Sequence, residues 1–200
     1  MVKGFCKRFA DRSDKNLSMA GKEVLIKSVA QALATYMMGA FKLPKGLCDD
    51  LTKMIRYYWW GAEDRKKKTH WVSWNNLVQP RCRGGMGFRD FLLFNQALLA
   101  RQAWRLLFYS DSLCSRLLKA KYFPNEELLD TIFTGNASNT WRSIEYGIEL
   151  LKKGIIWRVG NGKNFRIWRD NWIPRYFYLR PITRRRPSRL KWVADLIVEN

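Results

Sequence analysis

The longest apolar run in the chain covers residues 91–108 and predicts a central helix. The run holds no glycine or proline, and it is dominated by Leu, Ala, Gln and Arg, which favour helices. Asp90 precedes it, where a carboxylate can accept from the free amides of a first helical turn. At 100° per residue Asn95, Gln102 and Arg105 fall on one face, and most other positions are apolar. We expect a core helix that other segments cover, because arginines interrupt the run before it could span a bilayer.

Apolar residues at spacings of three and four predict further helices in the rest of the chain. These helices are expected at 19–39, 46–60, 112–122 and 140–153. Ser18 is the expected cap of the first helix and Asp111 that of the third, because both side chains can accept hydrogen bonds from free backbone amides. Trp71 and Trp74 lie three residues apart, so that a short helical turn can bury both rings.

The pattern changes after Gly154, where β-prone runs replace helical spacing. The dipeptide Asn161-Gly162 separates two such runs, and it is the strongest short hairpin signal because the turn needs positive φ angles. We therefore predict a β-hairpin at 155–168 with its turn at 160–163. The predicted fold class is mainly α: a helical bundle with this one hairpin.

The same patterns divide the chain into four segments. We expect a basic lead-in at 1–16, a helical region at 17–153, the hairpin with a Trp-rich segment at 154–175, and a basic Pro/Arg-rich linker at 176–200.

Charge is the unusual feature of the composition. Of 200 residues, 37 are basic and 17 acidic, which gives +20, while 47% are hydrophobic. Such a chain attracts polyanions, so RNA, DNA or an RNA–DNA hybrid is the expected partner class. A membrane is not expected, because no long basic amphipathic helix stands out. Residues 152–191 hold thirteen Lys or Arg against Asp170 alone, a net +12, and one sign at this density favours phosphate contact.

The candidate nucleic-acid-binding residues are cations from two basic stretches, and no sequence preference is expected of them. They are Arg158, Lys163, Arg166, Arg169, Arg184, Arg185, Arg186 and Arg189 in the second half, and Lys66, Lys67 and Lys68 in a polar loop at 63–69. The aromatic run Tyr57–Trp60 can also stack on bases, but rings at helical spacing more often belong to a core.

No catalytic, metal or cofactor site is predicted. The four cysteines lie more than thirty residues apart and His70 is the single histidine, which matches no zinc pattern. The glycines at 84–87 precede a helix, but the Lys-Ser/Thr pair of a phosphate-binding loop does not follow them. The acidic pair Asp49-Asp50 lies in the first turn of a predicted helix, where the helix dipole favours carboxylates. We therefore expect a protein that is not an enzyme.

Several segments together resemble one family. They are LSMAGKEVLIKSV (17–29), FKLPKGLCDDL (41–51), WWG (59–61), HWVSW (70–74), GGMGFRDF (84–91), FNQALLARQAWRLL (94–107), LLKAKYFP (117–124), TWRSI (140–144), WRVGNGKNFRIWRDNWIP (157–174) and VADLI (193–197). In this order they resemble the region downstream of the polymerase palm in plant non-LTR (LINE-type) retrotransposon reverse transcriptases.

The resemblance implies a thumb-like helical segment and a connector that hold nucleic acid by its backbone. It places the palm and its catalytic aspartates before Met1, and a zinc-binding domain and often an RNase H domain after Asn200. No catalytic residue can be carried over to this chain. The family implies the nucleus, while similar fragments in plant mitochondrial genomes leave the mitochondrion open.

Three hypotheses follow. The first is a non-catalytic reverse-transcriptase fragment that binds nucleic acid. The second is a truncated retroelement-derived protein with no selected function, in which exposed aromatic side chains would mark the place of a lost domain. The third is a remnant that binds a partner through such a surface.

Overall fold

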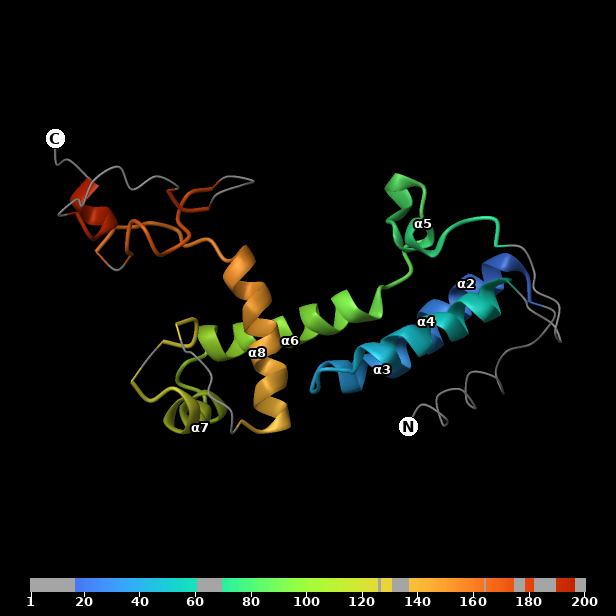
Figure 1. The fold of residues 1–200 in the computed structure, drawn as a ribbon, viewed down its shortest axis with the longest axis horizontal. Coiled ribbons are helices and arrows are strands. Elements are labelled where there is room, and N and C mark those ends of the chain that lie inside the picture. Colours follow the sequence, from blue (N-terminus) through green and yellow to red (C-terminus); the bar gives the residue numbers. More distant parts are fainter. Residues whose placement is uncertain are drawn as a thin grey trace. The chain divides into compact units, whose positions relative to one another are not determined.

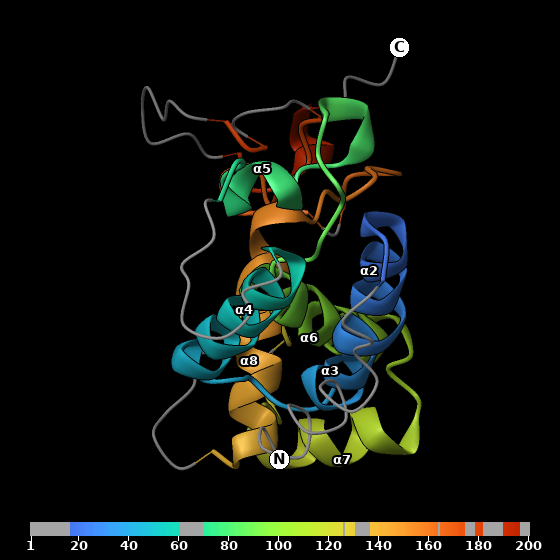
Figure 2. The same cartoon turned by 90° about the vertical axis from the view of Figure 1, so that its right-hand side faces the viewer.

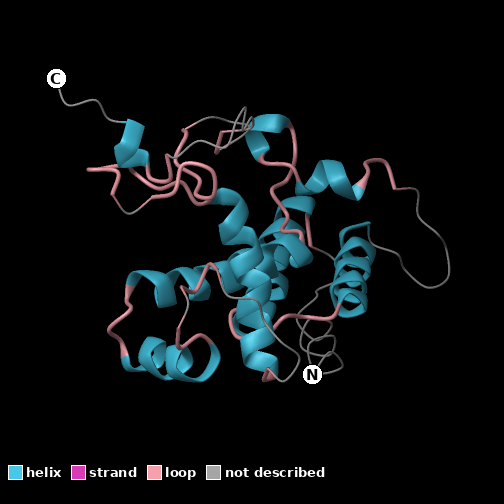
Figure 3. Ribbon diagram, turned by 60° about the vertical axis from the view of Figure 1, so that its left-hand side comes forward, coloured by secondary structure: helices cyan, strands magenta, loops and turns pink. Residues whose placement is uncertain are grey.

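The computed structural model describes residues 17–60, 70–125, 127–130, 137–163, 165–174, 179–181 and 190–196. The chain divides into two compact units, Met1–Leu150 and Leu151–Asn200. Within the described ranges the secondary structure is helical, and Figure 3 draws no strand there. The mainly α prediction is therefore confirmed. The predicted lead-in at 1–16 and the basic loop at 63–69 lie outside the described residues.

The predicted first helix forms as three consecutive pieces. They are α2 (Met19–Leu25), a π-helical turn η1 (Ile26–Ala30) and α3 (Gln31–Met38). Ser18 caps α2 as predicted, since its hydroxyl accepts from the Gly21 amide. The buried apolar side chains follow at every fourth residue, namely Ile26, Ala30, Ala34 and Met38.

Two apolar side chains of this helix remain exposed to solvent. Val24 and Tyr36 are 64% and 86% exposed, although both continue the apolar pattern. The amide of Gln31 donates to Ile26 five residues earlier, so the helix widens at this point. The wider turn changes the helical register of the positions that follow it, Tyr36 among them.

Helix α4 (Lys45–Trp60) packs against α2 in the first unit (Figures 1 and 2). It buries Cys48, Leu51, Ile55 and Trp59. The Trp59 ring meets the Phe88 ring edge-on, with centroids 5.2 Å apart. Trp59 is thus a core residue, while Tyr57 in the same aromatic run is 58% exposed.

The segment between α4 and the central helix is short and turn-rich. It contains α5 (Trp74–Val78) and a 3-10 turn η2 (Arg81–Arg83). Ser73 caps α5, so the helix begins at Trp74, whose ring stacks on Phe88. The expectation that Trp71 would be buried beside Trp74 is wrong: Trp71 precedes the cap and is 83% exposed.

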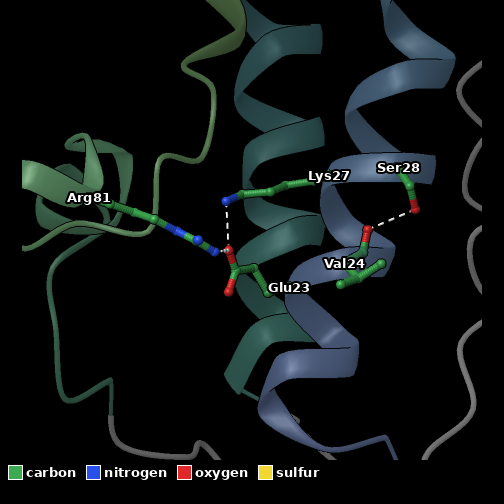
Figure 4. Close-up of polar contacts among 5 residues, drawn as sticks. All are labelled: Glu23, Val24, Lys27, Ser28 and Arg81. Atoms are coloured by element: carbon green, nitrogen blue, oxygen red, sulfur yellow. Dashed lines mark hydrogen bonds and ion pairs between the residues drawn. The ribbon is translucent and has the colours of Figure 1, made fainter.

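An ion-pair cluster ties this segment to α2. Glu23 of α2 accepts from Lys27, one turn further along, at 2.6 Å, and from Arg81 of η2 (Figure 4). These side-chain hydrogen bonds, that of Lys27 first, lower the pKa of Glu23. In the same view the Ser28 hydroxyl donates to the Val24 carbonyl, a bond within the helix itself.

The central helix α6 (Phe91–Phe108) has the predicted bounds. Asp90 caps it, with its carboxylate accepting from the amides of Leu92 at 2.9 Å and Leu93 at 3.0 Å. Asn95, which helical spacing groups with Gln102 and Arg105, is fully buried. The helix packs against α3, α4 and α7, as expected of a core helix.

Asn95 holds the connection between α3 and α4 against α6. Its amide nitrogen donates to the carbonyls of Met38 at 2.8 Å and Phe41 at 2.9 Å. Its amide oxygen accepts from the Leu43 N–H at 2.9 Å. A polar side chain can be buried here because backbone groups satisfy its hydrogen bonds.

Two further helices follow α6, namely α7 (Leu113–Tyr122) and α8 (Asn139–Gly154). Ser112 caps α7, since its hydroxyl accepts from the Ser115 amide, so the prediction that Asp111 is the cap is wrong. Trp141 of α8 is buried between the rings of Tyr122, at 4.4 Å, and Phe123, at 5.7 Å. Helix α8 crosses α6, as Figure 1 shows.

The predicted β-hairpin at 155–168 is wrong, although its turn exists. Gly162 has a φ of 71°, as the Asn-Gly signal requires. The flanking residues do not pair with each other in the described part of this segment. The Trp157 N–H donates to the Asn171 carbonyl at 2.8 Å, and Arg166 forms an isolated antiparallel bridge with Trp192. The residues on the two sides of the turn therefore pair with different segments and not with each other, and no strand forms in the described part of either side.

Across the described residues, none of the helices is both long enough and apolar enough to cross a membrane.

Candidate nucleic-acid interface

In the second unit, the 162–167 segment packs against residues 191–194. The amide of Ala194 donates to the Gly162 carbonyl at 2.9 Å, and the amide of Val193 donates to the Phe165 carbonyl at 2.8 Å. Ile167 and Val193 are the buried apolar side chains at this contact. A Cβ at Gly162 would lie 2.5 Å from the Ala194 nitrogen, so only glycine fits. Backbone contacts thus fix the segment that carries Lys163 and Arg166.

Asn171 connects the residues after the Gly162 turn to the end of α8. Its side-chain amide donates to the carbonyl of Lys152 at 3.1 Å, in the last turn of α8, and to that of Ile155 at 3.2 Å. The indole N–H of Trp172 donates to the Ile167 carbonyl at 3.0 Å. The Asn171 bonds join the two ends of the 152–171 stretch. The six cations of this stretch are all exposed, namely Lys152, Lys153, Arg158, Lys163, Arg166 and Arg169.

Arg166 has the best-defined surroundings among the predicted cations. Its guanidinium lies over the Trp192 ring, 5.6 Å from the centroid, and both side chains reach solvent. An aromatic face holds a guanidinium without hydrogen-bonding its N–H groups. Arg166 can therefore be positioned by Trp192 and still donate to a phosphate. The sequence interpretation missed Trp192, because nothing in the local pattern links residue 192 to residue 166.

The two described acidic residues of this unit bind backbone groups. The Asp170 carboxylate accepts from the Arg166 N–H at 2.7 Å. The Asp195 carboxylate accepts from the N–H groups of Lys191 at 2.9 Å and Trp192 at 3.0 Å. These two backbone bonds, that of Trp192 first, hold the pKa of Asp195 below its ordinary value. The acids therefore serve to shape the loop that presents the cations.

The structure brings together only part of the predicted set. Lys163 and Arg166 lie on the segment packed against 191–194, while Arg158 precedes the Gly162 turn and Arg169 lies in the following turn. The remaining candidates lie outside the described residues and stay predictions: Arg184, Arg185, Arg186, Arg189, Lys66, Lys67 and Lys68.

The described ranges contain no group of three or more His, Cys, Asp or Glu side chains placed to hold a metal ion. His70, the single histidine, stacks on the Trp60 ring at 5.6 Å, and its Nδ1 lies 3.5 Å from an Arg56 guanidinium nitrogen. His70 thus contacts side chains at the C-terminal end of α4.

Comparison with known proteins gives two relatives in Arabidopsis thaliana. An uncharacterized mitochondrial protein, AtMg00310, is 41% identical over 143 residues, which are 71% of this chain and 93% of that protein. A putative ribonuclease H protein, At1g65750, is 34% identical over 170 residues, which are 83% of this chain but 27% of that protein. No family model matches the chain.

At this identity and coverage, the chain belongs to the family of the uncharacterized mitochondrial protein AtMg00310. It also spans about a quarter of the putative ribonuclease H protein, so the similarity extends to part of a much longer plant protein.

Proposed function

We propose that the chain corresponds to the region downstream of the palm in a plant non-LTR retrotransposon reverse transcriptase. In this proposal it contributes nucleic-acid binding and no catalysis, and its second unit contacts backbone phosphates of RNA, DNA or their hybrid without sequence preference. The similarity to a stretch of the putative ribonuclease H protein supports a retroelement origin.

The observation that carries the binding proposal is the arrangement of charge in the second unit. Its described cations are exposed, while Asp170 and Asp195 hydrogen-bond to backbone N–H groups of the same loop. Arg166 lies over the Trp192 ring and is exposed. A surface that presents cations in this way favours a polyanion, and phosphate contacts carry no sequence information.

Two variants of the second unit test this proposal. Arg158→Gln with Lys163→Gln removes two exposed cations of the described loop, and Arg184→Ala with Arg185→Ala and Arg186→Ala removes the predicted arginine cluster. Each should weaken binding to DNA duplexes of different sequence by the same factor. Each should also make the slope of log K against log salt less negative, by about 0.9 for every phosphate that the variant no longer neutralises.

The control for the Arg158 and Lys163 pair removes two positive charges from the first unit. Lys45→Gln with Lys53→Gln changes two exposed lysines of α4 and should leave affinity and salt dependence close to those of the parent. If the control weakened binding as much as the loop variants, net charge would explain the effect and the second unit would not be the contact. Primer extension or RNA-strand cleavage above background, retained on repurification, would refute the absence of catalysis.

One observation favours the partner-binding hypothesis as a second candidate. The first unit exposes large apolar side chains on α7, with Leu113 and Leu117 72% and 62% exposed. Apolar clusters of this kind often mark a contact surface.

A further inference from the structure

The exposed side of α6 carries both aromatic rings and arginines. A purely apolar contact surface would not require the arginines. Arg101, Trp104, Arg105 and Phe108 lie within two turns at spacings of three and one, so they share one face. All four are exposed, Trp104 by 43% and Phe108 by 66%. We call these four residues the α6 stripe.

The two rings of the α6 stripe form an ordered platform. The Trp104 and Phe108 rings are nearly parallel, with centroids 6.1 Å apart and planes inclined by 21°. Tyr109 meets Phe108 edge-on at 5.1 Å, which supports the end of the platform. A flat ligand can therefore add to a stack that already exists, and little conformational entropy is lost on binding.

Positive charge surrounds this platform. Helices α6 and α7 contain no acidic residue between them, and they carry Arg101, Arg105, Arg116, Lys119 and Lys121. The nearest acids in sequence are engaged locally: Asp90 caps α6, and Asp111 accepts from the Ser110 hydroxyl. A ligand of this surface should therefore be both flat and anionic.

We propose that the α6 stripe binds single-stranded nucleic acid, with unpaired bases stacking on Trp104 and Phe108 and phosphates meeting Arg101 and Arg105. This inference rests on the proposed function for its ligand class and adds a preference for unpaired strands. Bases in a duplex already stack on each other, so exposed aromatic rings select strands with free base faces.

The same observations disfavour other occupants. A protein partner that covered the rings would also have to desolvate Arg101 and Arg105 and supply acids for both. A lipid surface would gain little, because the opposite side of α6 is buried in the first unit through Asn95, Leu99 and Ala103. An interfacial helix needs a broad apolar face free to insert.

The test compares an oligothymidylate with an abasic oligonucleotide of the same length, which keeps the phosphates and lacks the bases. The parent should bind the oligothymidylate more tightly. Trp104→Leu with Phe108→Leu keeps apolar bulk and helix propensity but removes the rings, and it should reduce this preference by roughly fivefold or more. Binding to the abasic strand should hardly change.

A matched control removes two exposed rings elsewhere in the first unit. Tyr36→Leu with Trp71→Leu replaces residues that are 86% and 83% exposed, and the preference for bases should stay at the parent level. Far-UV circular dichroism and thermal unfolding of each variant verify that the helices form.

The outcomes separate this inference from the proposed function. If the parent bound the abasic strand with a salt dependence but showed no preference for bases, the α6 stripe would not be a stacking platform, and the phosphate contacts would stand. If the parent bound neither strand, the α6 stripe proposal would fail, and if it also bound no duplex, the proposed function would fail with it. Were the leucine pair to keep the preference while it lowered self-association or binding to phosphatidylglycerol vesicles, the stripe would instead be a protein or lipid contact.

Discussion

Gly147 of α8 lies directly against the backbone of Leu99 in α6. A Cβ at position 147 would be 2.4 Å from the Leu99 carbonyl carbon and 2.5 Å from the Ala100 nitrogen. Real Cβ atoms do not approach backbone so closely, so the crossing of α6 and α8 depends on glycine at this position. The sequence pattern marks this residue only as one small position between Ile144 and Ile148.

Gly147→Ala should destabilise the protein, because α6 and α8 must move apart to accept a methyl group. We expect the free energy of unfolding to fall by about 1–3 kcal/mol, measured by urea denaturation. Gly46→Ala is the matched control, since nothing lies within 4 Å of its Cβ position and alanine favours the helix. If the two substitutions had equal effects, close approach at Gly147 would not be the cause.

Asn95→Leu should also destabilise the protein, for a different reason. The substitution leaves the carbonyls of Met38 and Phe41 and the N–H of Leu43 without their side-chain partner. We expect a loss of about 3 kcal/mol or more, since each unsatisfied buried group costs about 1–3 kcal/mol. Gln102→Leu on the same helix should change stability by less than about 0.5 kcal/mol. A small loss of stability in Asn95→Leu would contradict the role of these hydrogen bonds in holding the α3–α4 connection.

The Glu23 cluster predicts a dependence of stability on pH. Bonds from Lys27 and Arg81 lower the pKa of Glu23 below its ordinary value of 4.5. The carboxylate therefore stabilises the fold above pH 4.5, and this contribution disappears as pH falls through the lower, folded-state pKa.

Comparison of the parent with Glu23→Gln measures this contribution. The difference in unfolding free energy should be at most about 1 kcal/mol at neutral pH, should shrink in acid, and should decrease with salt, because the Arg81 side chain is 72% exposed. A difference that stayed constant down to acid pH would contradict the ion pairs. Asp50→Asn, which removes an exposed partner of Lys53, should show almost no effect.

Local signals predicted much of the first unit, because helix periodicity and caps depend on neighbours in sequence. The bounds of α6 and the caps at Asp90 and Ser18 are of this kind. At the start of α7 two adjacent residues could both act as a cap, and Ser112 does so in place of Asp111. The π turn η1 has no comparable sequence signal, so the exposed position of Tyr36, which follows it, could not be predicted.

The hairpin prediction failed because an Asn-Gly signal specifies the turn. It does not specify which segment pairs with the residues on each side of that turn. Asn161-Gly162 forms its turn, yet Trp157 hydrogen-bonds to Asn171, and Arg166 pairs with Trp192. Extended backbone can pair with any free edge, so these contacts depend on tertiary structure. The candidate interface also depends on tertiary structure. The sequence identified the basic residues, but it did not identify the contact between Arg166 and Trp192.

Gly162→Ala should disrupt the loop that presents these cations. Gly162 has a φ of 71°, which strains the backbone of an alanine. An added Cβ would also lie 2.5 Å from the Ala194 backbone, where there is no room for it. We expect faster proteolysis within residues 151–200 and weaker nucleic-acid binding, with the first unit unchanged by far-UV circular dichroism. Gly160→Ala, with open space around its Cβ, should behave like the parent. Equal protease sensitivity of the two variants would argue against this packing.

The central claim is that the chain binds nucleic acid through phosphates, and the salt dependence of its affinity for duplex DNA tests this claim most directly. If about five of the thirteen cations in residues 152–191 each neutralise a phosphate, log K should fall with log salt at a slope of about −4 to −5. The slope should be the same for duplexes of different sequence. A slope near zero, or no measurable binding at low salt, would contradict the account.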